Sequence, residues 1–289
     1  MKLSWHRTAL LLGYLAGLGT VAYYAMKGLP YYLTPLIERP RHELYWVLKP
    51  GGELGHRFGV IGTAMMVLML GYSLRKRIPF LRRMGPMSAW LDYHILLGIC
   101  GPLFILLHSS FKVQGLVALS FWSMVAVSVS GVLGRFLYRQ IPRTQAGTEL
   151  SAEEVRDLDQ RWTRELTEDL GMPTAKLQEL RAIAEEGVEP SRSLLWILGR
   201  MPIDLLWLRW RLSRFLRHSE GLTPKLRRRI ARVARNKAVL HRQQILWLKI
   251  RELFHYWHVL HKPFAIIMYL FMVIHIAVAW MTGYGWSGG

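Results

Sequence analysis

The sequence contains a single cysteine, Cys100, among its 289 residues. One thiol excludes an intrachain disulfide, a CxxCH site for covalent haem attachment and a cysteine-ligated iron–sulfur cluster within this chain. Because Cys100 lies inside an apolar stretch, we expect it to serve packing. The sequence also lacks a phosphate-binding glycine loop, a dinucleotide fingerprint and a nucleophile elbow, so it offers no visible flavin or nicotinamide site of its own.

Acidic residues are scarce, with 19 Asp and Glu against 38 Lys and Arg, and the formal net charge is +19 although 52% of the residues are hydrophobic. This combination is unusual for a soluble domain and is typical of a membrane protein with basic flanks. Lys2 and Arg7 precede an uncharged run over 8–26, which is long for the core of a signal peptide. We therefore expect a retained first helix, although residues 15–17 form a weak cleavage pattern.

Five uncharged stretches are long enough to cross a bilayer, which takes about 20 residues. The second is short, and we expect it to borrow Gly55 and His56. A short turn near Lys112 joins the third and fourth as an antiparallel hairpin. The fold class predicted is an all-α integral membrane protein, a bundle of about five transmembrane helices with a helical cytoplasmic insertion. The spans cover 8–26, 58–74, 93–111, 113–134 and 263–282, and the predicted divisions are 1–138, 139–255 and 256–289.

The distribution of Lys and Arg predicts the orientation of the spans. Basic residues gather at 2–7 and 75–83, whereas those of the 27–57 loop are diluted by acidic residues and the C-terminus is uncharged. The first group should be cytoplasmic, which places the N-terminus inside and the C-terminus outside. We expect a bacterial inner (cytoplasmic) membrane.

Two histidine pairs carry most of the functional information: His94 with His108, and His261 with His275, each separated by fourteen residues in a nearly uncharged stretch. On an α-helix, fourteen residues fall about 40° short of four turns and rise about 21 Å. Both histidines of a pair thus share one face. The predicted topology makes the two helices parallel, so that each histidine of one comes level with one of the other. This arrangement predicts two non-covalent b-type haems, each ligated through its iron by two imidazoles, His94 with His261 and His108 with His275.

Other interpretations of these histidines remain open. A single intramembrane histidine can simply hydrogen-bond between helices, but a duplicated spacing is hard to explain in that way. His255, His258 and His261 could suggest a zinc site by their spacing on one helix face, yet no acidic residue or cysteine lies near them in sequence. We prefer His261 as a haem ligand, with His258 as the fallback.

Further residues are candidates for contact with a cofactor. Gly101 lies midway between His94 and His108 on the same face, where it either lets a macrocycle approach or, with Gly98, allows close helix packing. Arg57 and Arg135 are candidate cofactor-binding residues.

The outer end of the second span carries His56 and Glu53. These two groups could exchange protons with a quinone, and His56 could instead contact a haem propionate. The other interpretation is an interfacial histidine without a chemical role. The aromatic residues of the 27–57 loop fit either a quinone or partner site for the outer haem, or ordinary interfacial anchoring.

The hydrophilic insertion has an acidic half and a basic half. Residues 149–189 hold twelve acids and five bases, and residues 192–251 hold sixteen bases and two acids. Residues 151–154 fit a capping box, and a helix is predicted from Leu226 through Phe254 until Pro263. Part of the basic charge is expected to be neutralised by the acidic half.

The stretch 194–216 mixes three tryptophans with arginines, which is typical of a helix in the headgroup layer. Arg200, Pro202 and Asp204 are expected to break it, so we do not count a sixth span. The basic run 225–229 indicates anionic lipid rather than nucleic acid.

The segments LDYHILLGICGPLFILLHSSFKV and HVLHKPFAIIMYLFMVIHIAV resemble the di-haem transmembrane cytochromes b. These include ferric reductase-like and NADPH oxidase membrane domains and the cytochrome b subunits of quinol-oxidising complexes. The resemblance covers 56–138 and 255–282 and implies two parallel helices, separated by one other, that each supply two haem ligands. Ferric reductase-like proteins usually have six helices and a flavin-nicotinamide domain, which this sequence lacks. Redox partner subunits are therefore expected: an iron–sulfur protein, a flavoprotein or a multihaem cytochrome.

The function expected is that of a subunit which carries electrons across the membrane, between a quinone or redox partner at one face and a partner subunit at the other. Low-spin iron with two histidine ligands has no free coordination site, so oxygen or substrate is not expected to bind at the metal. One alternative is the transmembrane core of a ferric or oxygen reductase that uses a separate flavoprotein. An alternative of another class is a non-redox membrane scaffold or anchor whose histidines only pair helices.

Overall fold

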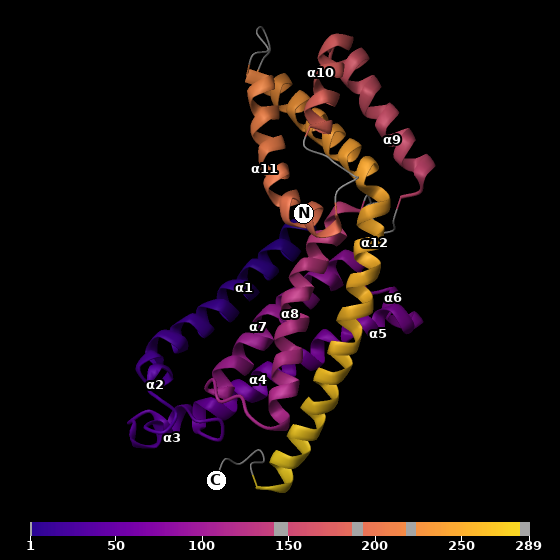
Figure 1. Cartoon of the computed structure of the whole chain (residues 1–289). Helices are drawn as coiled ribbons and strands as arrows, with labels where there is room; N and C mark the ends of the chain where they lie inside the picture. The colour runs from indigo at the N-terminus through magenta and orange to yellow at the C-terminus, as the bar shows by residue number, and fades with distance from the viewer. Residues whose placement is uncertain (1, 142–149, 187–192, 218–223, 284–289) are drawn as a thin grey trace. The chain divides into compact units, whose positions relative to one another are not determined.

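A computed structural model describes residues 2–141, 150–186, 193–217 and 224–283 of the chain (Figure 1). These residues form helices joined by turns, and they contain no strand. The fold class predicted from the sequence, an all-α membrane bundle, is confirmed. The chain divides into two compact units, one of residues 1–134 and 257–289 and the other of residues 135–256. We call them the membrane unit and the inserted unit, and each is described by itself.

Within the part of the chain that the structure describes, five helical stretches are long and apolar enough to cross a membrane, as predicted: Trp5–Lys27, Tyr45–Arg77, Met87–Ser109, Val117–Arg139 and Lys249–Met281. The second starts earlier than its uncharged core, so Gly55 and His56 do belong to it. The helices of the membrane unit are α1 (Lys2–Lys27), α2 (Leu29–Leu33), η1 (Arg39–Arg41), α3 (Tyr45–Leu48), α4 (Glu53–Met69), α5 (Gly71–Arg77), α6 (Pro79–Arg82), α7 (Met87–Ser109), α8 (Leu116–Gln140, as far as Gly134) and α12 (Pro224–Met281, from Trp257).

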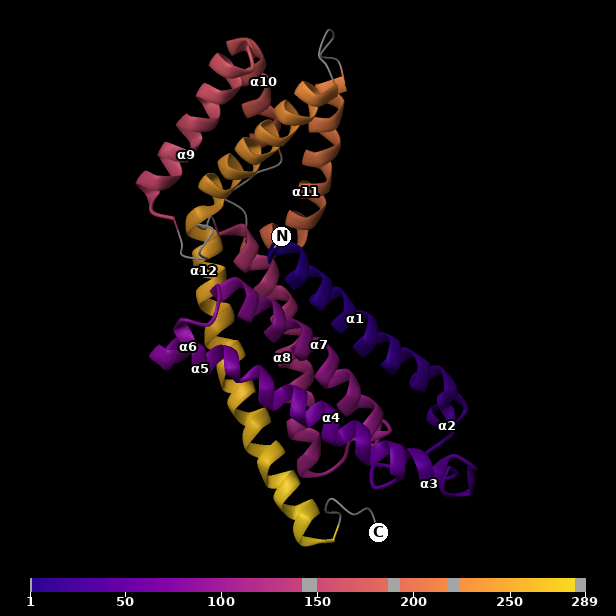
Figure 2. The ribbon, with the colours of Figure 1, turned by 180° about the vertical axis from the view of Figure 1, so that it is seen from behind.

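The turn between α7 and α8 reverses the chain within a few residues, as the sequence predicts. Ser110 and Phe111 both adopt left-handed backbone conformations, with φ of 47° and 60°. Ser110 is buried, and its hydroxyl donates a hydrogen bond to the carbonyl of Leu48 over 2.6 Å. α8 then returns beside α7, as both views show (Figures 1 and 2).

Polar contacts fasten the apolar helices of the membrane unit to one another. The Tyr269 hydroxyl on α12 donates to the Met66 carbonyl on α4 over 2.7 Å. The Ser120 hydroxyl on α8 donates to the Met268 carbonyl over 3.1 Å. Around these bonds the methionines Met66, Met124 and Met268 form a buried cluster between α4, α8 and α12.

Outward-facing side chains of the spans are large and apolar, including Leu11, Leu15, Val129, Ile266 and Leu270. Such a surface suits contact with lipid acyl chains. Cys100 is buried in α7, where an added Cβ on Gly17 of α1 would lie 2.6 Å from its sulfur. Its environment fits the packing role expected from the sequence.

The inserted unit is built from α9 (Ala152–Arg164), a π-helical turn η2 (Glu165–Asp169), α10 (Thr174–Glu185), α11 (Leu194–Arg217) and the first part of α12. The predicted capping box opens α9: the Glu154 N–H donates to the Ser151 hydroxyl over 3.1 Å, and the Ser151 N–H donates to the Glu154 carboxylate over 2.7 Å. A buried apolar core holds the four helices together, with Leu166, Leu180 and Leu208 among its members.

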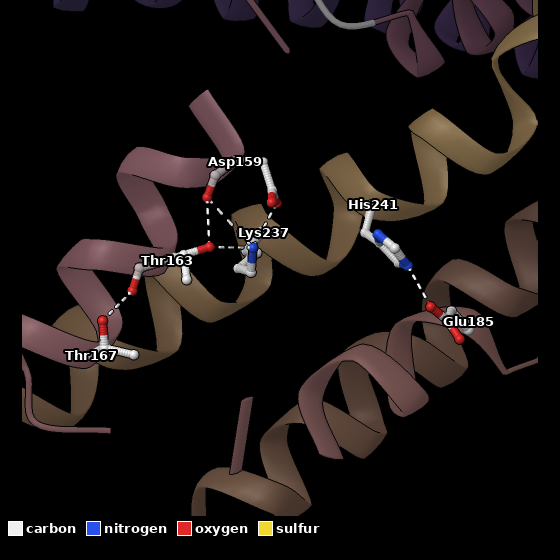
Figure 3. Close-up of polar contacts among 6 residues, drawn as sticks. All are labelled: Asp159, Thr163, Thr167, Glu185, Lys237 and His241. Atoms are coloured by element: carbon white, nitrogen blue, oxygen red, sulfur yellow. Dashed lines mark hydrogen bonds and ion pairs between the residues drawn. The ribbon is translucent and has the colours of Figure 1, made fainter. Parts of the chain in front are cut away.

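Ion pairs join the acidic and basic halves of the inserted unit (Figure 3). The ammonium of Lys237, whose side chain is only 4% exposed, donates to the Asp159 carboxylate over 2.6 Å and to the Thr163 hydroxyl over 2.7 Å. His241 contacts Glu185 over 2.7 Å. Further pairs join Arg229 with Glu165 and Arg211 with Glu186. The predicted partial neutralisation of the basic half is thereby confirmed.

Two helix ends predicted at prolines are wrong. α11 continues through Pro202, and an Arg200–Asp204 pair of 3.2 Å at i,i+4 supports the turn that was expected to break. α12 continues through Pro263 to Met281. A proline removes one intrahelical hydrogen bond, and the apolar packing on both sides of it sustains the helix. α11 is still not among the five spans.

Candidate functional site

The site begins with a stripe of glycines on α4. Gly55, Gly59 and Gly62 are buried at positions i, i+4 and i+7. Small residues at this spacing let two helix backbones approach each other closely. A Cβ on Gly62 would lie 2.9 Å from the Gly101 carbonyl oxygen of α7, and a Cβ on Gly101 would lie 3.3 Å from the Gly62 carbonyl oxygen. Gly101 therefore faces α4, and its placement fits close helix packing; the cofactor-contact role considered for it stays a prediction.

The two histidines of α7 form hydrogen bonds with backbone carbonyls of α4. His94 Nδ1 lies 3.1 Å from the carbonyl oxygen of Met69, and His108 Nδ1 lies 2.8 Å from that of Gly55. Met69 is the last residue of α4, where helix carbonyls lack intrahelical partners. Because a carbonyl can only accept, each Nδ1 carries the proton. In the neutral ring the lone pair is then on Nε2.

The antiparallel register of α4 and α7 explains why both bonds form. Each step of seven residues along α7, from His94 to Gly101 to His108, is matched by a step of seven back along α4, from Met69 to Gly62 to Gly55. Seven residues are about two helical turns. One packing register thus orients both imidazoles. Gly59 makes room for the second, because a Cβ there would lie 2.7 Å from His108 Nδ1.

His261 of α12 is oriented by α8 instead. The Ser130 hydroxyl has one hydrogen, which it donates to the Val127 carbonyl over 2.9 Å, so its oxygen accepts from His261 Nδ1 over 2.7 Å. The lone pair of a neutral His261 is then also on Nε2. Trp257 packs on the His261 ring with centroids 4.8 Å apart and donates its indole N–H to the Ser130 carbonyl over 2.6 Å.

The structure brings together the two histidines of one expected pair. The ring centroids of His108 and His275 lie 6.3 Å apart, with the ring planes at 63°. The pairing of His94 with His261 stays a prediction. Two imidazoles on opposite sides of one metal ion, with metal–nitrogen bonds of about 2.0 Å, would have ring centroids roughly 6 Å apart. The separation of His108 and His275 and the available Nε2 lone pair of His108 fit bis-imidazole ligation.

The remaining candidates have more ordinary surroundings. Glu53 and Arg57 form an exposed i,i+4 ion pair of 2.9 Å. His56 is half-buried and lies within electrostatic range of His108. Arg135 belongs to the inserted unit, where its guanidinium lies 5.9 Å from the ring centroid of Tyr138. In the described ranges, no group of three or more His, Cys, Asp or Glu is placed to hold a metal ion.

Sequence reasoning missed a buried arginine, which contacts the main chain two residues after His108. Arg39 is 7% exposed, and its guanidinium donates to the carbonyls of Tyr32 over 2.8 Å and Thr34 over 2.9 Å, and to the carbonyl of Ser110. Ser110 follows His108 by two residues, so Arg39 fastens the 27–57 loop to this end of α7. An arginine in a polar loop gives no sequence signal for such a role. The glycine spacing on α4, in contrast, was visible in the sequence.

No family model, no curated protein and no solved structure matches this chain. Its function is therefore argued from its own residues.

Proposed function

We propose that this chain is a di-haem b-type cytochrome subunit that carries electrons across a membrane. The observation that supports this most strongly is the state of the histidines: His94, His108 and His261 each have Nδ1 engaged, which leaves Nε2 available as a ligand. Histidines that bind metals usually donate their other ring N–H to a carbonyl or a similar acceptor. Histidines that only joined helices would have no reason to bring the rings of His108 and His275 to a centroid distance of 6.3 Å.

In this proposal His94 and His261 hold one haem, and His108 and His275 hold the other. A bound haem supplies reversible one-electron oxidation and reduction of its iron. The chain supplies the ligand orientation. α4 fixes the two rings of α7 through the Met69 and Gly55 carbonyls, and Ser130 fixes His261.

Spacing supports transport across the membrane rather than along its surface. His94 and His108 lie fourteen residues apart on α7, which corresponds to a rise of about 21 Å along the helix. The two ligand pairs would therefore lie at different depths. A redox partner subunit or a quinone would exchange electrons at either face. Glu53 and His56, at the end of α4 beside His108, are the groups we assign to proton exchange with a quinone.

Haem content of the full-length chain tests the proposal. Protein purified from haem-replete cells should contain two non-covalent haems per chain by the pyridine haemochrome assay, with a reduced-minus-oxidised spectrum of low-spin b type. His255→Ala is the matched control, because this exposed histidine lies outside the four-ligand set and should leave the ratio near two. A wild-type ratio near zero would leave the non-redox scaffold as the better explanation. Flavin in the complex isolated from its native membrane would favour the reductase core.

A further inference from the structure

Helix α11 has apolar side chains on two opposite faces. Leu208 and Leu212 are 2% and 3% exposed and belong to the core of the inserted unit. Trp207 and Trp210 are 53% and 49% exposed, and Ile203 is 54% exposed. At about 100° per residue, these three lie close together on the helix surface, well away from the buried leucines. A second apolar face of this size needs an environment other than water.

Arginines cover the edges of this exposed face. The guanidinium of Arg200 lies 5.2 Å from the ring centroid of Trp196, that of Arg211 lies 5.9 Å from Trp207 and that of Arg214 lies 5.3 Å from Trp210. Ion pairs with Asp204 and Glu186 partly neutralise Arg200 and Arg211. Counted over its whole length, α11 has five arginines and one aspartate, a formal charge of 5 − 1 = +4. The face is therefore both aromatic and cationic.

We propose that the α11 outer face, formed by Ile203, Leu206, Trp207 and Trp210, inserts into the headgroup layer of an anionic membrane. Tryptophan prefers this layer because its ring is apolar and its N–H is polar. Arginine stems can lie along the rings while their guanidinium groups contact lipid phosphates. The opposite face is fixed in a folded core, so the helix is ordered before it meets the lipid. The five spans hold the chain at a membrane, which keeps such a surface within reach.

Site-specific fluorescence on the full-length chain tests this proposal. Cys100 is replaced by serine in all variants, and an NBD label is attached at Ile203→Cys or Trp207→Cys. Gln178→Cys is the matched control, because it lies exposed on α10 of the same unit. Each protein is reconstituted into phosphatidylcholine vesicles with or without phosphatidylglycerol, and with brominated or ordinary acyl chains.

We expect the labels at 203 and 207 to emit at shorter wavelength in the anionic vesicles and to lose at least half of their intensity with brominated lipid. The label at 178 should show neither effect. Arg214→Gln in the Ile203→Cys protein should reduce the quenching. Labels at 203 and 207 that behave like the control would overturn the proposal. Emission at shorter wavelength without quenching by brominated lipid would also overturn the proposal, since a protein surface and not lipid would then cover the face. Equal quenching in pure phosphatidylcholine would refute the anionic preference. None of these outcomes depends on haem content.

Discussion

Replacement of Gly59 by alanine is the most direct test of how α4 orients His108. The new Cβ would lie 2.7 Å from Nδ1 of His108 and 2.8 Å from its Cε1, both inside van der Waals contact. The imidazole would have to move away from α4, and its 2.8 Å bond to the Gly55 carbonyl would lengthen or break. The ligand itself remains in place, so the variant separates orientation from ligation.

The energies involved can be estimated from the contacts. A lost hydrogen bond costs about 1 kcal/mol, and overpacking of a tight site adds about 1–3 kcal/mol. Alanine regains about 1 kcal/mol from its better helix propensity. The net loss of stability is therefore about 1–3 kcal/mol. Misorientation of a metal ligand through its hydrogen-bond partner typically lowers metal affinity by about 10–100-fold.

Haem titration of the apo-protein and redox titration of the purified chain provide the assay. We expect Gly59→Ala to weaken or lose one of two redox components and to leave the other unchanged. Gly19→Ala is the control, because a Cβ at Gly19 meets nothing within 4 Å. It should retain both components and equal or slightly exceed the wild type in thermal stability. Two unchanged components in Gly59→Ala would refute the view that α4 positions His108.

Three further predictions concern the pairing of His94 with His261, the inserted unit and Tyr32 of α2. His94→Ala and His261→Ala should lose the same redox component, and loss of different components would contradict the pairing. Asp159→Ala should destabilise the inserted unit by about 3 kcal/mol, measured by thermal unfolding, because the substitution leaves the Lys237 ammonium buried without its carboxylate partner. A loss of stability below about 1 kcal/mol would argue against a structural role for this ion pair. Burial raises the pKa of Tyr32 from 10.0 to about 12, and among the described side chains its buried hydroxyl has no hydrogen-bond partner. Stability present below pH 10 should therefore be lost as the pH rises through 12, by up to about 3 kcal/mol. Tyr32→Phe should remove this loss and raise stability at neutral pH by about 1 kcal/mol. An alkaline unfolding profile that is the same in the variant and the wild type would refute the assignment of the loss to Tyr32.

Features encoded in short stretches of sequence could be predicted. The five spans follow from runs of apolar residues, and the start of α9 follows from Ser151 and Glu154, which contact each other within one helical turn. The histidine spacing is equally local, since it depends only on helix geometry. The pairing of His108 with His275 needed one more assumption, that two distant helices run parallel.

Features that depend on tertiary contacts could not be predicted. Pro202 and Pro263 are helix breakers by local rules, but packing on both sides of them sustains α11 and α12. Arg39 caps the Ser110 carbonyl across 71 residues of sequence, and Ser130 reaches His261 across 131. Nothing within a helical turn of either residue distinguishes it from other arginines and serines. Such positions become visible only when the helices are placed together.

The two helices that carry the proposed ligands, α7 and α12, differ in how their histidines are held, and this difference predicts which of them adapts. On α7 both imidazoles donate to backbone carbonyls of α4, which are acceptors that the main chain itself supplies. On α12, His261 depends on one serine hydroxyl, and His275 contacts the ring of His108. We infer that α4 and α7 form the fixed half of the site and that α12 supplies the adjustable half. Substitutions of residues that contact the α12 histidines, such as Ser130→Ala on α8, should then shift a redox potential without loss of the haem.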